Sequence, residues 1–341
     1  MLRSYQFCIE QPDARQRLDE FLASRLGGLS RMRIANLIEA GACVVNGATG
    51  RAGYRIAEGD AIEMSFEEGP PTSMLPEPIP FTIVHEDDHL IVVVKPAGML
   101  VHPTMSVKSG TLANALAYHL NRSRIDNTES TVDHRSSIFD PQPAMRPGLV
   151  HRLDRATSGL MVVAKTSRAL TVLSRHFRKR LVEKRYLALV HGSLDQESGT
   201  ISAPIGRDPN LQPHWRVIQD GRFAETRFKV IKRLERATLL ELEPVTGRTN
   251  QLRIHCAHMG HPMVGDEMHR NFESRISNLE VNADAQDEQS PIRNSQFETR
   301  LCLHACTLAF HHPASGDWMR YSSPQPEDIS RIIQCYRSRK W

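Results

Sequence analysis

A proline-rich segment decides how the rest of this chain can fold. Residues 67–80 read EEGPPTSMLPEPIP, and their five prolines exclude a helix or a central strand, because proline lacks the backbone N–H that both need. We therefore predict a linker over 69–80, with a small module over 15–68 before it and a larger domain over 81–325 after it. At 341 residues the chain is long enough for two such units.

The module over 15–68 has the pattern of two short helices followed by short strands. Apolar residues at helical spacing predict helices within RQRLDEFLASRLGG and RMRIANLIEAG, with Ser30 as the cap of the second. ACVVNG and AEGDAIEMSF predict strands, and the first strand runs into a hairpin turn at Asn46–Gly47. Arg31 and Arg33 would lie in the first turn of the second helix, where the helix dipole disfavours cations. A phosphate partner would explain them, and arginines that simply face water are the alternative.

The larger domain mixes strands and helices without regular alternation, which predicts an α+β fold. Strands are expected in IVVVK, RYLALVHG, TLLELEPV and RLCLHACTLAF. Helices are expected in TLANALAYHL, SRALTVLSRHFRKR and NQLRIHCAHMG, with Thr249 as the cap of the last. The polar stretch 121–147 predicts a mobile insertion, and 270–298 predicts a second irregular region.

The segment GLVHRLDRATSGLMVVAKT, residues 148–166, places charged residues between two apolar strand patterns. Asp154 lies there between Arg152 and Arg155, whose guanidiniums favour the ionised carboxylate. A loop aspartate held in a structural salt bridge is the alternative. Tyr186 at the mouth of a strand and Arg253 in the first turns of a helix would add a phenol and a guanidinium. Such a set suits covalent or electrostatic catalysis at a sugar–base unit without a metal or cofactor.

A basic run, RHFRKRLVEKR over 175–185, stands out against a net charge of only +4. Clustered cations are the electrostatic signature of a surface that binds phosphate. We therefore expect Arg178, Lys179, Arg180 and Lys184 to contact phosphate groups. A solvated helix end is the alternative.

Several classes of site have no support in the sequence. It contains no Walker loop, no dinucleotide-binding glycine pattern and no GxSxG turn, so no nucleotide or redox cofactor is expected. Histidines and cysteines cluster twice without zinc spacing, and we favour core packing over a metal site. These residues are His255, Cys256, His258, His261, Cys302, His304, Cys306, His311 and His312. The six cysteines form no disulfide pattern, and neither a membrane span nor a signal peptide is evident, which predicts a cytoplasmic protein.

Five segments of the larger domain follow one another in an order that matches a known family. They read VVVKPAGMLVHP, HRLDRATSGLMVVAKT, KRYLALVHG, ELEPVTGRTNQLRIHCAHMGHPMVGD and LHACTLAFHHP. Together they resemble the RluA-type pseudouridine synthases, and the resemblance covers most of residues 81–325. It implies a catalytic domain with a mixed, largely antiparallel sheet. The module over 15–68 resembles the S4 RNA-binding module that many members carry in front.

The resemblance assigns roles to the three candidate catalytic residues. It implies that Asp154 attacks the uridine, either at the ribose C1′ or at the base, and that the uracil is released, rotated and rejoined through carbon. Tyr186 would lie against the target base and assist proton removal, and Arg253 would pair with Asp154. Arg152 and Arg155 would either meet RNA phosphate or support the loop. The implied enzyme is a monomer without a cofactor that acts on structured RNA, with large-subunit ribosomal RNA expected first and transfer RNA second.

The chain departs from the family pattern at two places. Asn250 stands where the family commonly has histidine, and DEMHR at 266–270 replaces the usual tyrosine–glycine ending. Two other functions remain open. One is an inactive S4-type RNA-binding protein, and an intact HRLD, RY and QLR set argues against it. The other is a glycosidic hydrolase, which needs a second carboxylate that the sequence does not make evident.

Overall fold

A computed structural model describes residues 2–26, 29, 31–67, 74–129, 146–209, 214–269 and 300–336. The chain divides into two compact units. The first contains Met1–Pro76 and Ala117–Arg146, and the second contains Glu77–Leu116 and Pro147–Trp341. The predicted Ser30 cap, the middle of the 121–147 insertion and the whole of the 270–298 region lie outside the described residues.

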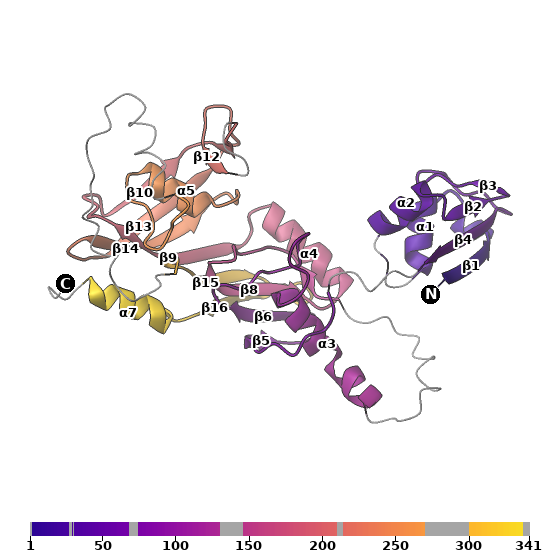
Figure 1. Cartoon of the computed structure of the whole chain (residues 1–341), viewed down its shortest axis with the longest axis horizontal. Coiled ribbons are helices and arrows are strands. Elements are labelled where there is room, and N and C mark those ends of the chain that lie inside the picture. Colours follow the sequence, from indigo (N-terminus) through magenta and orange to yellow (C-terminus); the bar gives the residue numbers. More distant parts are fainter. Residues whose placement is uncertain are drawn as a thin grey trace. The chain divides into compact units, whose positions relative to one another are not determined.

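The first unit is built on a four-stranded antiparallel sheet in the order β1-β4-β2-β3 (Figure 1). Its elements are β1 (Leu2–Cys8), the 3-10 helix η1 (Gln11–Asp13), α1 (Leu18–Arg25), α2 (Arg31–Glu39), β2 (Cys43–Val45), β3 (Ala48–Thr49) and β4 (Ala61–Glu67). Strand β1 precedes the range 15–68 and pairs with β4 along its full length. Helix α1 begins at Leu18, later than the predicted pattern at Arg15, because the N–H of Arg15 instead donates to Ile56 in a left-handed turn with φ of 72°. Apolar side chains of both helices and the sheet form its core, among them Leu18, Leu22, Ile34, Ile38 and Met64.

The second unit is built on a ten-stranded sheet. The strands follow the order β10-β13-β14-β9-β15-β8-β6-β5, with β16 added to β15 and β7 added to β8. Their bounds are β5 (Thr82–Glu86), β6 (Leu90–Lys95), β7 (Gly148–Leu149), β8 (Ser158–Ala164), β9 (Glu183–His191), β10 (Ser198–Ser202), β13 (Glu225–Arg233), β14 (Ala237–Pro244), β15 (Leu303–His311) and β16 (Trp318–Ser322). A separate ribbon pairs β11 (Ile205–Arg207) with β12 (Trp215–Val217).

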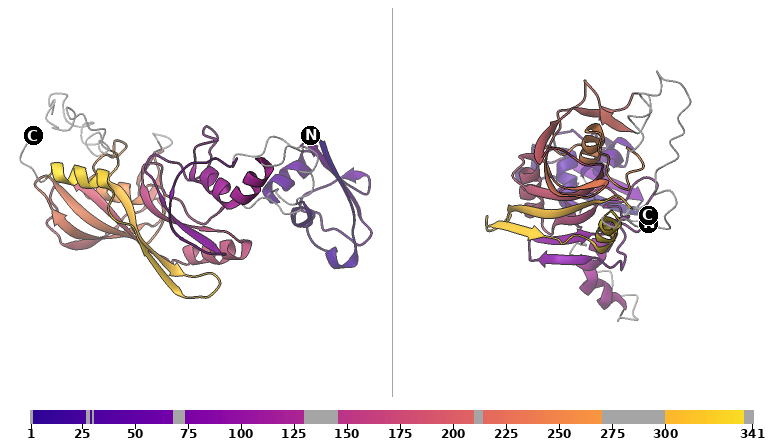
Figure 2. Two further views of the ribbon diagram at one scale, coloured as in Figure 1. Left: turned by 90° about the horizontal axis from the view of Figure 1, so that it is seen from below. Right: turned by 90° about the vertical axis from the view of Figure 1, so that its left-hand side faces the viewer.

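Strand β15 lies in the middle of this sheet, between β8 and β9. Its pairing with β9 is antiparallel and its pairing with β8 is parallel, at His304–Ser158 and Ala305–Gly159. Gly159 has φ of 121°, and a Cβ there would overlap the backbone of Ala305. The glycine that ends the HRLDRATSG segment is therefore required by the close approach of β15. The hairpin of β15 and β16 extends beyond the neighbouring strands in Figure 2.

Four helices of the described part of the chain cover the two faces of this sheet. Helix α5 (Gln251–His258) packs on β9, β13 and β14, and α7 (Glu327–Cys335) packs on the opposite face of β9 and β14. Helix α4 (Ser167–Arg178) and the start of α3 (Leu112–Glu129) cover opposite faces of β6 and β8. The result is an α+β fold with a mixed, largely antiparallel sheet, which confirms the predicted fold class. Helix α3 continues to Glu129, so the expectation of an irregular segment from residue 121 onward is wrong for its first residues.

Candidate active site

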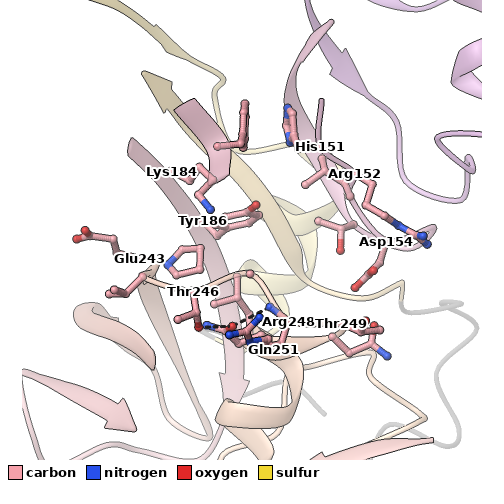
Figure 3. A pocket seen from close by; sticks show the side chains of 18 of the residues that line it. His151, Arg152, Asp154, Lys184, Tyr186, Glu243, Thr246, Arg248, Thr249 and Gln251 are labelled. Atoms are coloured by element: carbon pink, nitrogen blue, oxygen red, sulfur yellow. Dashed lines mark hydrogen bonds between the residues drawn. The ribbon is translucent and has the colours of Figure 1, made fainter. Parts of the chain in front are cut away.

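A cavity of about 780 Å³ opens in the second unit, above the junction of β9, β15 and the turn that carries Asp154 (Figure 3). Three segments far apart in sequence line it: the HRLD turn, the stretch from the end of α4 into β9, and the turn between β14 and α5. Asp154, Tyr186 and Arg253 all belong to its lining. The structure thus brings the three predicted catalytic side chains to one cavity.

The HRLD turn is held by contacts on both sides of Asp154. Leu153 is buried in the core against α3 and β6, while the half-buried Asp154 accepts a backbone hydrogen bond from Thr157 at 3.1 Å. On the other side the ring of His151 stacks on Phe177 at 4.5 Å, and its Nε2 accepts the backbone N–H of Val162. Burial, with help from the charge of Lys184, lowers the pKa of His151 to about 3. The imidazole is therefore neutral and acts as a rigid support for the turn.

The arginines beside Asp154 do not hold it. In the described part of the chain no ion pair joins Asp154 to Arg152 or Arg155, so the alternative of a loop aspartate held by these arginines in a structural salt bridge is wrong. Arg152 is exposed at the cavity lining. Arg155 is exposed too, and its Nε donates to the carbonyl of Gly98 at 2.9 Å, which ties the turn to the loop after β6.

Lys95 supplies a buried cation beneath this turn. Its side chain is fully buried, and Nζ donates to the carbonyls of Pro96, Met99 and Arg155 at 2.7, 2.8 and 3.2 Å. Burial lowers the pKa of Lys95 to about 8, and the charge of Asp154 opposes that shift. The signal for this residue in the sequence is a lysine that ends the apolar strand IVVVK.

Tyr186 lies on β9 opposite the HRLD turn, and Figure 3 shows both side chains facing the cavity. It pairs across the sheet with Leu242 on one side and Ala305 on the other. Burial raises the pKa of Tyr186, and the negative charge of Asp154 raises it further. The phenol therefore keeps its proton while Asp154 is a free carboxylate.

Arg253 is held by a buried carboxylate that sequence reasoning missed. Its Nε and Nη2 donate to Asp266 at 2.8 and 2.6 Å, so this guanidinium is paired with Asp266 and not directly with Asp154 as predicted. Burial would raise the pKa of Asp266, but hydrogen bonds from Arg253 and His269 hold it well below its ordinary value. The charge of Asp154 also acts on Arg253. Asp266 thus fixes the direction of the guanidinium, whose field still reaches Asp154.

A buried amide shapes the turn between β14 and α5. The Oε1 of Gln251 accepts hydrogen bonds from Thr246 Oγ1 at 2.6 Å and from the backbone N–H of Arg248 at 2.9 Å, drawn dashed in Figure 3. Its Nε2 donates to the carbonyl of Glu225 and to Thr226 Oγ1. The turn that carries Arg248 is therefore anchored to β13 and presents its guanidinium from a fixed backbone.

The basic run divides into cavity residues and one outlier. Arg178, Arg180 and Lys184 line the cavity, whereas Lys179 does not and instead ends helix α4 with its backbone N–H. Burial, together with Arg180, lowers the pKa of Lys184. Arg180 has φ of 58°, a left-handed conformation that non-glycine residues rarely adopt.

Comparisons with known proteins agree with this geometry. The family model for RNA pseudouridylate synthase matches residues 89–258. The ribosomal large subunit pseudouridine synthase D of Xanthomonas campestris is 36% identical over 95% of this chain and 90% of its own length. The chain belongs to the RNA pseudouridine synthase family. The resemblance to RluA-type members and the predicted isomerase class are thereby confirmed.

Two further matches extend the comparison. RNA pseudouridine synthase 2, chloroplastic, of Arabidopsis thaliana is 34% identical over 94% of this chain and 80% of that protein. The solved structure of human RNA Pseudouridylate Synthase Domain Containing 4 has a TM-score of 0.53 and 23% identity, and covers 74% of this chain and 92% of that one. At that identity the structural match shows that this pseudouridine synthase shares the fold.

The structure explains one departure of this pseudouridine synthase from its family pattern. Asn250, and not the predicted Thr249, is the cap residue of α5, and it has φ of 52° without a side-chain capping bond. Asparagine and histidine are among the residues that best tolerate this left-handed conformation, so either can begin the helix here. The Oδ1 of Asn250 also accepts a long hydrogen bond of 3.5 Å from Arg253 Nη1.

The arginines of the first unit have partners of their own. The Nε of Arg31 lies 2.8 Å from Asp19 and its Nη1 lies 2.6 Å from Glu20. These carboxylates offset the unfavourable helix position of Arg31, so a phosphate is not needed to explain an arginine there. Arg33 is half-buried on the same helix. RNA binding by this unit stays a prediction.

Two of the clustered histidines, His255 and His304, are buried in the core. His255 shares hydrogen bonds with Thr226 Oγ1 and the carbonyl of Ala203, and His304 with Ser158 Oγ and Ser323 Oγ. Within the described ranges no three histidine, cysteine, aspartate or glutamate side chains are grouped as metal ligands. None of the helices that the structure describes is long and apolar enough to cross a membrane.

Proposed function

We propose that this pseudouridine synthase isomerises uridine in large-subunit ribosomal RNA, with Asp154 as the nucleophile. The observation that carries the catalytic assignment is the placement of Asp154 in one cavity with Tyr186 and Arg253, where its charge acts on both. Relatives named for the ribosomal large subunit support the substrate class. Such a substrate would place the enzyme in the cytoplasm, and transfer RNA is the second candidate.

The reaction exchanges one bond of the uridine for another. The N1–C1′ bond breaks, a C5–C1′ bond forms, C5 loses a proton and N1 gains one, so there is no net oxidation or reduction. Asp154 adds its carboxylate oxygen either to C1′ or to the base, and it leaves again when the carbon–carbon bond has formed. The buried Lys95 and the guanidinium of Arg253 are the cations on which the charge of Asp154 acts, so both lie within electrostatic reach of the reacting carboxylate.

Tyr186 changes its proton affinity during the cycle. Part of its raised pKa comes from the charge of Asp154. Once Asp154 forms a covalent bond to the nucleotide it no longer carries that charge, so the pKa of Tyr186 falls at the stage when C5 must be deprotonated. A phenol that holds its proton cannot accept a second one, so Tyr186 would relay the C5 proton, releasing its own proton to water in the cavity as it takes the one from C5. The fall in its pKa after the attack favours that release.

The test compares Asp154→Asn with Asp195→Asn, a control on the exposed loop after β9. Each purified variant is incubated with large-subunit ribosomal RNA and with transfer RNA, and pseudouridine and free uracil are quantified separately. We expect Asp154→Asn to form no pseudouridine while binding RNA as the wild type does, and Asp195→Asn to be fully active. Pseudouridine formation by Asp154→Asn refutes the nucleophile, and free uracil from the wild type indicates a hydrolase.

The same experiment separates the remaining alternatives. A wild-type protein that binds RNA and forms neither product is the inactive RNA-binding protein. If the wild-type protein modifies transfer RNA and not ribosomal RNA, transfer RNA is the substrate. Mapping pseudouridines in ribosomal RNA from cells with and without the gene then identifies the uridine.

A further inference from the structure

An exposed aromatic side chain lies next to the cavity without belonging to its lining. Phe223 is 53% exposed, in the connection between β12 and β13. Exposed apolar residues are common on proteins and need no explanation by themselves. Phe223 differs because its backbone is clamped and because it lies beside the arginines of the cavity.

The backbone around Phe223 is fixed on both sides. Arg222 exchanges two hydrogen bonds of 2.9 Å with Ile205, and the carbonyl of Ala224 accepts one from Ala203. Gly221 permits the close approach, since a Cβ there would overlap the backbone around Ile205. The ring is therefore presented from a rigid segment, with little backbone freedom to lose when a ligand packs on it.

The pattern of burial places Phe223 on the same side as a cavity residue. Ala224, Thr226 and Phe228 are buried, whereas Phe223 and Arg227 are exposed. Alternation along an extended segment puts residues two apart on one face, so Phe223 shares a face with Arg227, which lines the cavity.

A second arginine connects Phe223 to the cavity directly. The Nε of Arg248 donates to the carbonyl of Phe223 at 3.0 Å, and Arg248 lines the cavity. Its remaining guanidinium N–H groups are available for an acceptor such as phosphate. Arg248 lies beside Phe223, and Arg227 lies four residues further along the same face, with its guanidinium 3.9 Å from Glu225 and 3.7 Å from Glu243. An exposed aromatic ring with these cations has the two parts of a single-stranded nucleic-acid site, a surface for a base and cations for the backbone.

We propose that Phe223 forms a stacking subsite for an unpaired base that neighbours the target uridine, with Arg248 and Arg227 contacting the adjoining phosphates. This inference rests on the proposed function in that it assumes RNA in the cavity. A uridine that enters the cavity must leave its stack, so its neighbours also lose stacking partners. The ring of Phe223 replaces one of those partners.

The test measures affinity for a single-stranded RNA oligonucleotide that holds one uridine flanked by adenosines, and for the same strand with abasic nucleotides as flanks. Phe223→Ala should weaken binding of the first strand about five- to 150-fold, the range of base–aromatic stacking, and should hardly affect the abasic strand. Phe223→Trp should retain affinity. Phe223→Leu should lose it, because leucine is apolar but has no aromatic face.

Trp318 provides a matched control. It is 49% exposed, and it packs against His311 on the β15–β16 hairpin instead of the cavity. Trp318→Ala should therefore leave RNA affinity unchanged. Equal losses in Phe223→Ala and Trp318→Ala, or equal losses on both RNA strands, overturn the subsite.

A rate measurement separates this proposal from the proposed function. With ribosomal RNA at saturation, the single-turnover rate of Phe223→Ala should be close to that of the wild type, whereas Asp154→Asn has none. Unchanged affinity in Phe223→Ala together with an inactive Asp154→Asn refutes the subsite alone. An active Asp154→Asn refutes the catalytic assignment. The stacking subsite is then tested by the RNA affinity of Phe223→Ala alone.

Discussion

Arg180 allows a test of whether the basic run is adapted to RNA at the expense of stability. It follows the last turn of α4 with φ of 58°, and its N–H donates to the carbonyl of Phe177 at 3.2 Å. Glycine usually occupies such a position after a helix. A residue with a side chain destabilises the folded state by about 1–2 kcal/mol in this conformation. Arg180 has this unfavourable conformation, and its side chain lines the cavity.

The variant Arg180→Gly should therefore be more stable and bind RNA less well. Release of the left-handed strain is partly offset by the greater freedom of glycine in the unfolded chain, about 0.5–1 kcal/mol. The net gain is about 0.5–1 kcal/mol, which raises the melting temperature of a unit of this size by about 1–4 °C. Loss of one phosphate contact should lower the slope of log K against log salt by about 0.7–0.9.

Calorimetry of the full chain and RNA titrations over a series of salt concentrations measure the two effects. Lys179→Ala is the control, because it removes the same charge from a neighbour that has an ordinary φ of −82° and does not line the cavity. We expect this control to melt no higher than the wild type and to keep its salt slope. A lower melting temperature with an unchanged slope in Arg180→Gly would refute the reasoning.

Three further substitutions test the supports of the site. Gly159→Ala should lower the free energy of unfolding by at least about 2 kcal/mol in urea titrations, because its Cβ meets the backbone of Ala305, and an unchanged midpoint would contradict that contact. Asp266→Glu keeps the charge but moves the carboxylate that holds Arg253, so kcat should fall at least about tenfold while KM for RNA changes little; wild-type kcat would show that the pairing is irrelevant. Burial and the charge of Arg300 lower the pKa of His304 to about 4, whereas histidine in the unfolded chain has a pKa of about 6.5. Between these two values the unfolded chain binds a proton that the folded state excludes, so the free energy of unfolding falls as the pH drops from about 6.5 to about 4. His304→Gln should therefore lose about 2 kcal/mol less than the wild type between pH 7 and pH 5, and equal losses would count against a neutral His304.

Local patterns predicted the strands well, because short apolar runs rich in valine, such as IVVVK and LMVVA, are typical of strands buried on both faces. They also located the HRLD turn between β7 and β8 and the basic run beside the cavity. The same patterns failed at helix ends. Thr249 has the better capping side chain, but the chain needs a left-handed residue at the start of α5, and Asn250 meets that need.

Partners distant in sequence could not be predicted in this way. The pairing of Arg253 with Asp266 and the contact of Lys95 with the carbonyl of Arg155 both depend on how the loops meet in three dimensions. The sequence suggested that the guanidiniums of Arg152 and Arg155 act on Asp154, because adjacency in sequence is the only proximity it displays. The fold instead places a lysine from β6 beneath the turn.

The position of β15 has a consequence for how this enzyme is made. Asp154 and Tyr186 belong to β8 and β9 and their flanking turns, and the strand that lies between β8 and β9 is β15, close to the C-terminal end of the chain. A ribosome therefore completes all three candidate catalytic residues long before it delivers the strand that brings them together. Contacts of such long sequence separation form late and slowly. A chain interrupted before β15 would contain every candidate catalytic side chain without the strand that joins them, so we expect activity to begin only after β15 has been made.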